Sequence, residues 1–187
     1  MISPDGYSKL ETGQLRFDIE DVVIGDAIGS LVSLVRPQAL AKEMTIRVVD
    51  DDMRAVVRAD SERLRQIVLN LLSNAIKFTP RGGCVVISAS LESSDVRVHI
   101  ADNGIGMPHD KLDLVFEPYL RLEAARGAGE TGWGLGLAIS RELARAMDGD
   151  LTASSLADES TVFTLRIPRS TRIAPALDRL NPLGRSS

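Results

Sequence analysis

Two asparagines and a lysine stand at helical spacing in the stretch NLLSNAIKFTPRGG, residues 70–83. At about 100° per residue, Asn70 and Asn74 point about 40° apart on a helix, and Lys77 follows them on the same side. Asparagine weakens helix interiors because its side chain competes for backbone hydrogen bonds. A polar row at the edge of an apolar face could line a pocket between a helix and a sheet. Taken alone, the row could equally be a solvated helix face.

A carboxylate follows a predicted strand in ADNGIGM, residues 101–107. Asp102 ends a run of alternating apolar residues, and Gly104 and Gly106 come directly after it. Glycines let the backbone turn sharply and approach a ligand closely. Asp102 could therefore accept a hydrogen bond from the exocyclic amine of a base, although a simple tight turn would use the same residue types.

A second glycine motif opens a predicted helix in TGWGLGLAIS, residues 131–140. Gly132, Gly134 and Gly136 precede or begin the helix, whose first N–H groups and dipole would favour a phosphate. The spacing is neither that of a P-loop nor that of a dinucleotide-binding turn. By itself it indicates a phosphate site or merely a flexible helix start.

Composition excludes several other classes of protein. Hydrophobic residues make up 44% and charged residues 26% of the 187, which is typical of a globular chain. The net charge is −4, and the segment from residue 169 onward is basic, so the preceding part is acidic and no nucleic-acid partner is expected. Cys84 is the only cysteine, so there is no internal disulfide. No apolar run approaches a membrane span and no signal peptide is visible, so we expect a cytoplasmic chain without direct membrane contact.

The elements that must position these motifs can be predicted from hydrophobic periodicity. Two strands near residue 50 are expected to be joined by an acidic turn, and the last helix to end at an Asp-Gly pair. The order predicts an α+β protein, a two-layer sandwich with helices on one face of a mostly antiparallel mixed sheet. The predicted helices are 21–44, 60–78 and 135–147; the predicted strands are 44–50, 54–60, 84–91, 95–102, 150–155 and 160–168.

In combination, the motifs resemble those of a known family. LRQIVLNLLSNAIKFTP resembles the N box of the catalytic and ATP-binding domain of sensor histidine kinases, and DNGIGM resembles its G1 box. VFEPYLR is similar to the F box, and GWGLGLAISRELARAMDGDL to the G2 box and the helix after it. The resemblance covers residues 16–168 and places the chain in the GHKL superfamily, whose fold is the sandwich predicted above. It implies ATP and Mg²⁺ as ligands and a mobile ATP lid at about residues 107–131.

The resemblance also implies roles for single residues. Asn74 would be the Mg²⁺ ligand, since an amide oxygen suits a hard cation, and Asn70 would help to hold the metal and its waters. Lys77 would reach the phosphates as a mobile charge, and Arg121 would contact the γ-phosphate from the lid. Asn70, Lys77 and Arg121 are the predicted catalytic residues. Asp102 would bind the adenine amino group.

The remaining predicted ligand contacts come from glycines and apolar side chains. Glycines after the carboxylate would allow close approach of the base, and those of the G2 box would cradle phosphates; they are Gly104, Gly106, Gly132, Gly134 and Gly136. The residues expected to pack around the base or close to it are Ile76, Ile105, Met107, Leu135, Leu137 and Phe163.

Two features bear on activity. ATP hydrolases of the superfamily carry a glutamate where this chain has Asn70, and asparagine cannot act as a general base, so the site should hold ATP for transfer. Trp133 stands where the family has a small residue, and no glycine precedes the last strand in ADESTVF. These departures keep open a regulatory pseudokinase, and an anti-sigma-type serine kinase is a third possibility.

The phosphoacceptor is expected to lie on a separate domain. YSKLETGQLRFD, residues 7–18, is similar to the end of a dimerisation helix, so residues 1–15 are interpreted as a remnant of that helix or a linker, and 169–187 as a tail or linker. His99 and His109 are the only histidines, and neither lies on a helix resembling the family's acceptor helix. The expected partners are therefore the parent's dimerisation domain and, indirectly, a response regulator.

Overall fold

The computed structural model describes residues 15–49, 52–119, 134–156 and 160–171. After the first strand and the first helix, pairs of successive strands are separated by single helices, with two short 3₁₀ turns after the fifth strand. The elements are β1 (Ile19–Val23), α2 (Ile24–Ala41), β2 (Thr45–Val48), β3 (Val56–Asp60), α3 (Ser61–Phe78), β4 (Cys84–Leu91), β5 (Asp95–Asp102), η1 (His109–Lys111), η2 (Leu114–Phe116), α4 (Gly136–Arg145), β6 (Asp150–Leu156) and β7 (Ser160–Pro168).

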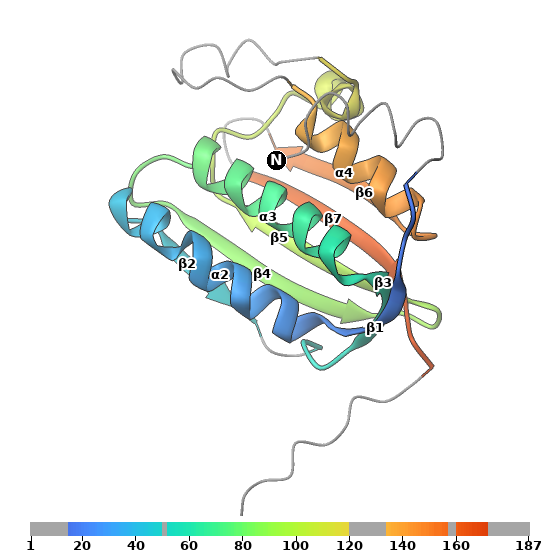
Figure 1. Cartoon of the computed structure of the whole chain (residues 1–187). Coiled ribbons are helices and arrows are strands. Elements are labelled where there is room, and N and C mark those ends of the chain that lie inside the picture. Colours follow the sequence, from blue (N-terminus) through green and yellow to red (C-terminus); the bar gives the residue numbers. More distant parts are fainter. Residues whose placement is uncertain (1–14, 50–51, 120–133, 157–159, 172–187) are drawn as a thin grey trace, which may run out of the picture.

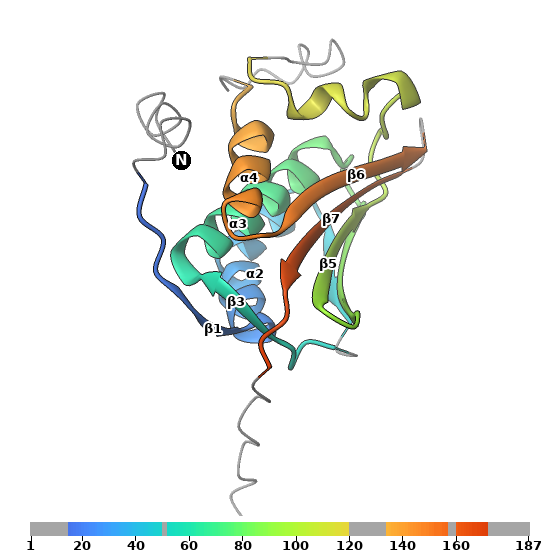
Figure 2. The ribbon, with the colours of Figure 1, turned by 90° about the vertical axis from the view of Figure 1, so that its right-hand side faces the viewer.

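A five-stranded sheet in the order β2-β4-β5-β7-β6 forms one layer of the protein. β2 pairs with β4 in parallel, and the other three pairings are antiparallel. Helices α2, α3 and α4 form the second layer, on one face of this sheet (Figures 1 and 2). The arrangement confirms the predicted fold class.

Alternation of side chains decides which face of the sheet is buried. Val96, Val98 and Ile100 of β5 point at the helices and are almost fully buried, as are Leu165 and Ile167 of β7. Successive side chains of a strand point to opposite faces, so the intervening positions form the other face. The strong apolar stripe of α3 closes the core from the opposite side, with Leu64, Ile67, Val68, Leu71, Leu72, Ala75 and Ile76 all buried.

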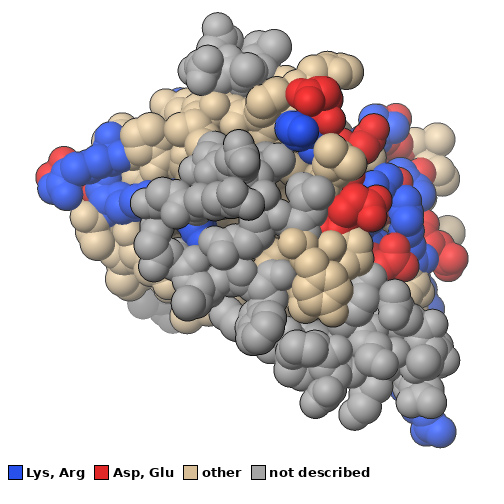
Figure 3. Space-filling view, turned by 90° about the horizontal axis from the view of Figure 1, so that it is seen from above, with Lys and Arg blue, Asp and Glu red and all other residues tan. Residues whose placement is uncertain are grey.

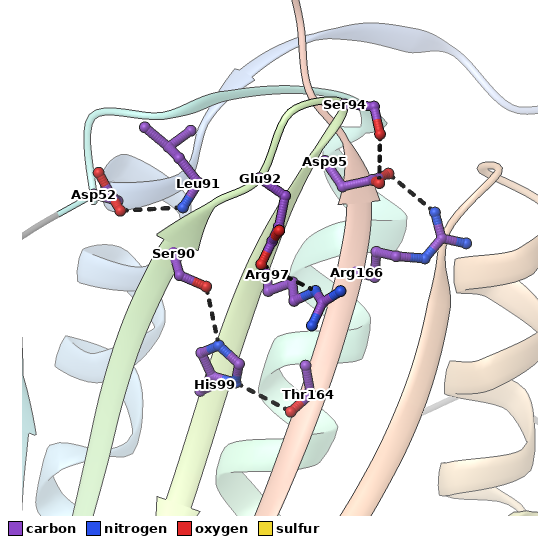
Figure 4. Close-up of polar contacts among 10 residues, drawn as sticks. All are labelled: Asp52, Ser90, Leu91, Glu92, Ser94, Asp95, Arg97, His99, Thr164 and Arg166. Atoms are coloured by element: carbon purple, nitrogen blue, oxygen red, sulfur yellow. Dashed lines mark hydrogen bonds and ion pairs between the residues drawn. The ribbon is translucent and has the colours of Figure 1, made fainter.

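The face of the sheet turned away from the helices is polar where Figure 4 shows it. His99 of β5 lies between Ser90 of β4 and Thr164 of β7, and each of its ring nitrogens is within hydrogen-bond distance of one hydroxyl group (Figure 4). Partial burial of the ring, and the nearby Arg97, lower the pKa of His99 below its usual value. This histidine therefore has local partners on the face opposite the helices.

Two predictions about the N-terminal third were wrong. The predicted helix 21–44 begins only at Ile24, because Asp21–Val23 belong to β1, which pairs with β3 over Ile19–Val23. The short strand β1 cannot be told apart from the start of the helix in the sequence, because its valines continue the apolar spacing of α2. The strands near residue 50 do not form a hairpin: β2 pairs with β4, whereas β3 pairs with β1 in a separate two-stranded sheet.

The two-stranded sheet lies at the end of the molecule where α3 begins (Figure 1). Past the end of β7, the N–H of Ser170 donates to Val56, and Arg169 forms an isolated bridge with Val57. Among the described residues, no helix combines the length and the apolar composition that a bilayer crossing requires.

Candidate nucleotide-binding site

Helix α3 carries the predicted asparagine–lysine row and begins at a well-formed cap. Asp60, the last residue of β3, is buried and accepts a hydrogen bond from the N–H of Arg63 at 3.0 Å. A side-chain oxygen in this position satisfies one of the free N–H groups of a helix start. The second oxygen of Asp60 accepts from the N–H of Asp18 at 3.0 Å, so one carboxylate joins the chain before β1 to the start of α3.

Asn70 lies against the start of α4. Its side-chain amide donates to the hydroxyl of Ser140 at 3.0 Å. A Cβ atom added to Gly136 would lie 2.5 Å from the Asn70 Oδ1, which is closer than non-bonded atoms tolerate. The glycine at position 136 is therefore needed for α4 to approach α3, and the N box and the G2 box form one surface.

No side chain caps the N-terminus of α4 within the described residues. Its N-cap residue, Leu135, is buried and makes no side-chain capping hydrogen bond, and the first turn contains no acidic residue. Gly134 has a φ of +67°, a conformation that glycine adopts readily. With no cap among the described residues, the first N–H groups of α4 could bind an anion, and the helix dipole would support it. Leu137 is half-buried and packs against the core.

Asp102 lies at the end of β5 with only 6% of its surface exposed. Its Oδ1 accepts from the N–H of Gly104 at 2.9 Å. Burial raises its pKa from 3.8 to about 6, and the N–H of Gly104 and the nearby Thr79 oppose this rise. The Thr79 hydroxyl itself is buried without a hydrogen bond of ordinary geometry within the described residues. A buried carboxylate and a buried hydroxyl thus lie next to each other at the end of β5.

The turn after Asp102 is tightly packed against the end of α3. A Cβ atom on Gly104 would lie 2.6 Å from Asp102 Oδ1 and 2.7 Å from the carbonyl oxygen of Phe78. Gly106 has a φ of +62°. The N–H of Met107 then donates to the hydroxyl of Ser155 at 2.7 Å, which holds the exit of this turn to β6. Both predicted glycines thus stand where a side chain would clash or strain the backbone.

Asn74 and Lys77 complete the row on α3. Both are half-buried. Within the described residues, the Asn74 side chain makes no hydrogen bond, so its amide oxygen could bind a cation. Lys77 places its ammonium group 5.5 Å from the ring centre of Phe78. The described residues contain no group of three His, Cys, Asp or Glu side chains that could hold a metal. A divalent cation would therefore take most of its ligands from phosphates and water, as Mg²⁺ commonly does.

The described part of the predicted lid, residues 107–119, packs against α4. Phe116 of η2 is buried, and the Arg141 guanidinium lies 4.7 Å from its ring centre while also pairing with Asp150. The N–H of Tyr119 donates to the carbonyl of Gly134 at 3.1 Å, so these two residues, on either side of the segment 120–133, lie next to each other. A shallow hollow between η2 and α4 includes none of the predicted site residues.

Charge on this end of the molecule is mixed. Basic and acidic side chains are interspersed on the described part of the face in Figure 3, and ion pairs such as Arg81–Glu43 and Arg145–Glu142 neutralise several of them. A phosphate site here therefore depends on local N–H groups and on Lys77 rather than on a basic patch.

The other predicted site residues differ in how deeply they are buried, and some of them lie outside the described residues. Ile76 and Phe163 are buried in the core, Met107 is half-buried against it, and 43% of Ile105 is exposed. Arg121, Gly132 and Trp133 lie outside the described residues, so their roles remain predictions. His109 lies in η1.

Sequence reasoning missed three residues that shape the site. Thr79 directly follows the asparagine–lysine row, but nothing in the sequence shows that it faces Asp102. Gly83 packs so closely that an added Cβ would lie 2.2 Å from a Thr79 methyl carbon. Ser140 lies on α4, 70 positions from its partner Asn70, and only the fold brings the two together.

Comparison with known proteins identifies relatives. Residues 59–171 match the family described as histidine kinase-, DNA gyrase B- and HSP90-like ATPase. An uncharacterized sensor-like histidine kinase of Rhizobium meliloti is 34% identical over 163 residues, and the sensor kinase/phosphatase LuxQ of Vibrio parahaemolyticus is 36% identical over 169. These matches cover 86% and 87% of this chain but only 31% and 20% of the relatives, so the chain spans less than a third of either.

Solved structures show the same fold. Full-length ShkA in complex with AMPPNP has a TM-score of 0.78 and 29% identity, covering 90% of this chain and 35% of ShkA. The mycobacterial sensor histidine kinase MprB has a TM-score of 0.69 and 26% identity, covering 81% of this chain and 98% of that one.

Proposed function

The chain belongs to the histidine kinase-, DNA gyrase B- and HSP90-like ATPase family, and we propose that it is the ATP-binding catalytic domain of a two-component sensor histidine kinase. It binds ATP with Mg²⁺ and transfers the γ-phosphoryl group to a histidine on a dimerisation domain. One observation carries the proposal: the Gly-rich start of α4 lies directly on Asn70 of the polar row. ShkA, which shares the fold, was crystallised with the ATP analogue AMPPNP.

The base of ATP is recognised at the end of β5. The ionised Asp102 accepts a hydrogen bond from the adenine amino group, and the buried hydroxyl of Thr79 beside it adds a second polar contact. Gly104 and Gly106 let the backbone approach the ring. Ile105, Met107, Leu137 and Phe163, with Ile76 beneath them, supply the apolar surroundings.

The phosphates lie between α3 and α4. Their oxygens accept from the free N–H groups at the start of α4, next to Gly134 and Gly136, and Lys77 adds a positive charge. Asn74 would offer its amide oxygen to Mg²⁺, and Asn70, already oriented by Ser140, would help to hold the metal and its waters. Mg²⁺, when bound, neutralises charge on the phosphates during transfer. Arg121, in the lid, contacts the γ-phosphate.

Asn70 decides between transfer and hydrolysis. An amide cannot accept a proton from water, so the site does not activate water for attack. In the transfer, a nitrogen of the acceptor imidazole forms a bond to the γ-phosphorus, the bond to the ADP oxygen breaks, and the imidazole releases its proton. The chain's own residues bind and orient ATP for this step.

The acceptor histidine belongs to a dimerisation domain, and a response regulator receives the phosphoryl group later. The chain's relatives are sensor kinases several times its length. We place the catalytic domain at residues 16–168, with a lid at about 107–131, the remnant of a dimerisation helix at 1–15 and a tail or linker at 169–187.

The experiment compares MgATP binding and phosphotransfer in matched variants. Calorimetric titrations with ATP, in Mg²⁺ and in EDTA, are made on the wild type, on Asn74→Ala and on Ser73→Ala. Ser73 is the exposed neighbour of Asn74 on α3 and serves as the control. Wild type and Ser73→Ala should bind ATP in a Mg²⁺-dependent manner, and Asn74→Ala should lose that dependence.

Phosphotransfer is then measured with labelled ATP and the dimerisation domain of the parent kinase. The expected product is an acid-labile phosphohistidine on that domain and none on this chain. Mg²⁺-dependent binding without any transfer would support the regulatory pseudokinase instead, and absence of nucleotide binding by the wild type would refute the proposal.

A further inference from the structure

The side chain of Lys42 extends from the C-terminal end of α2 to the C-terminal end of α3. Lys42 is the C-cap residue of α2 and is half-buried. Its ammonium group donates to the carbonyl oxygens of Ile76 at 2.7 Å, Lys77 at 3.0 Å and Thr79 at 3.0 Å. An ammonium group has three donors and no acceptor, so all three of its N–H groups are used.

These contacts complete the C-terminus of α3. The last four carbonyls of a helix lack partners within the helix or depend on the residues that follow it. Here the carbonyl of Ala75 accepts from the N–H of Thr79, and that of Phe78 faces the N–H of Ile105 at 3.4 Å. Lys42 supplies donors for the two carbonyls between them. Its positive charge also lies where the helix dipole favours a cation.

The turn that Lys42 holds is part of the proposed nucleotide site. It carries Lys77, proposed to contact phosphate, and Thr79, which lies by Asp102. The carbonyl of Phe78 both contacts the Ile105 N–H and limits the space at Gly104. A shift of this turn would therefore move the phosphate contact and the base pocket together.

Backbone hydrogen bonds connect the same two segments. The N–H of Gly82 donates to the carbonyl of Lys42 at 2.9 Å, and the N–H of Thr45 donates to the carbonyl of Gly83 at 3.0 Å. The segment 42–45 thus binds both the end of α3 and the turn after it. The side chain of Lys42 is the part of this connection that can be removed without breaking the backbone.

We propose that Lys42 is a positioning residue of the nucleotide site, which fixes the last turn of α3 so that Lys77 and Thr79 face ATP together. This inference rests on the proposed function. Lys42 does not touch the nucleotide. It acts through three carbonyls, and a flat guanidinium cannot present donors to three convergent oxygens as an ammonium group does.

The test compares Lys42→Met with Arg81→Met. Methionine keeps the aliphatic stem and removes the donors. Arg81 is an exposed cation nearby, and within the described residues its side chain pairs with Glu43 and not with α3. MgATP affinity is measured by calorimetry at a temperature where each variant is fully folded by circular dichroism. Lys42→Met should weaken binding by at least about tenfold, and Arg81→Met should leave it unchanged.

A double-mutant cycle separates positioning from a merely structural role. If Lys42 acts through the turn, its loss should cost much less affinity in a Lys77→Met background than in the wild type. The ¹⁵N–¹H resonance of Thr79 should also shift in Lys42→Met without nucleotide. Equal ATP affinity in wild type and Lys42→Met, or additive losses in the double mutant, would overturn the inference. Absence of binding by the wild type would instead refute the proposed function.

Discussion

Replacing Asp102 with asparagine should stabilise the free protein and weaken its ATP binding. The carboxyl is buried, and its pKa is raised from 3.8 to about 6 by burial. Asparagine has the same shape, carries no charge and keeps an oxygen that can accept from the N–H of Gly104. The substitution thus removes the cost of burying a charge while leaving the local packing in place.

The magnitude follows from the difference between the two pKa values. One pKa unit corresponds to about 1.4 kcal/mol. Ionising Asp102 therefore costs about 3 kcal/mol more in the folded state than in the unfolded chain. Between pH 4 and 6 the folded protein binds more protons at this group than the unfolded chain does. Its contribution to stability is therefore present at pH 4 and is lost as the pH rises through 6. At pH 7, the free energy of unfolding of Asp102→Asn should exceed that of the wild type by up to about 3 kcal/mol. Near pH 4, the two free energies of unfolding should be similar.

The assay is urea denaturation of both proteins at several pH values between 4 and 7.5, followed by circular dichroism. The difference between the two curves isolates Asp102 from other titrating groups, among them His99, whose lowered pKa acts in the opposite direction. Asp95→Asn, at the other end of β5, is the control. A hydrogen bond from Ser94 lowers the pKa of Asp95, with Arg166 also contributing (Figure 4), so this variant should lose stability at pH 7 and not at low pH.

Calorimetry with MgATP tests the other half of the prediction. Binding should favour the ionised carboxylate, so wild-type affinity relative to Asp102→Asn should fall as the pH drops below 6. Comparing the proteins at equal pH cancels the titration of ATP itself. A stability difference that does not change between pH 4 and 7, or an asparagine variant less stable than the wild type at pH 7, would refute the burial of an ionised Asp102.

Two further substitutions test how α3 and α4 are held. Asp60→Ala removes the cap of Arg63 and should lower the free energy of unfolding by about 1–2 kcal/mol in urea titrations, whereas an unchanged value would contradict the capping role. Gly136→Ala places a Cβ against Asn70 and should reduce ATP affinity in calorimetry. Gly29→Ala, where an added Cβ meets no atom within 4 Å, should leave affinity unchanged, and equal losses in both would contradict the close approach of the helices.

The strands of the sheet were predictable where one face of the strand is buried and turn-forming residues stand at its ends. β4, β5 and β7 begin and end where the alternation of apolar residues predicts. Strand pairing was less predictable, because β2 and β3 are adjacent in sequence yet pair with β4 and β1. Which strand a short segment joins depends on the whole fold, and local periodicity carries no information about it.

The candidate site was predictable as motifs but not as contacts. The residue types and the spacing of the motifs predict a polar pocket that includes Asn70, Asp102 and Gly136. Lys42 stands 34 positions before Ile76 in a segment that resembles any helix end, and its contacts exist only after α2 and α3 have packed. Residues that position others from a distance leave no local signal in the sequence.

The same site departs from several rules that stabilise the rest of the fold. Within the described residues, no side chain caps the start of α4, no cation pairs with the buried Asp102, and the Thr79 hydroxyl makes no hydrogen bond of ordinary geometry. Each departure costs stability in the free protein, and each can be relieved by a nucleotide: phosphate at the helix start, an amino group at the carboxylate and a polar atom at the hydroxyl. Because all three lie on elements joined through α3, their coincidence is better explained by a ligand than by three independent defects.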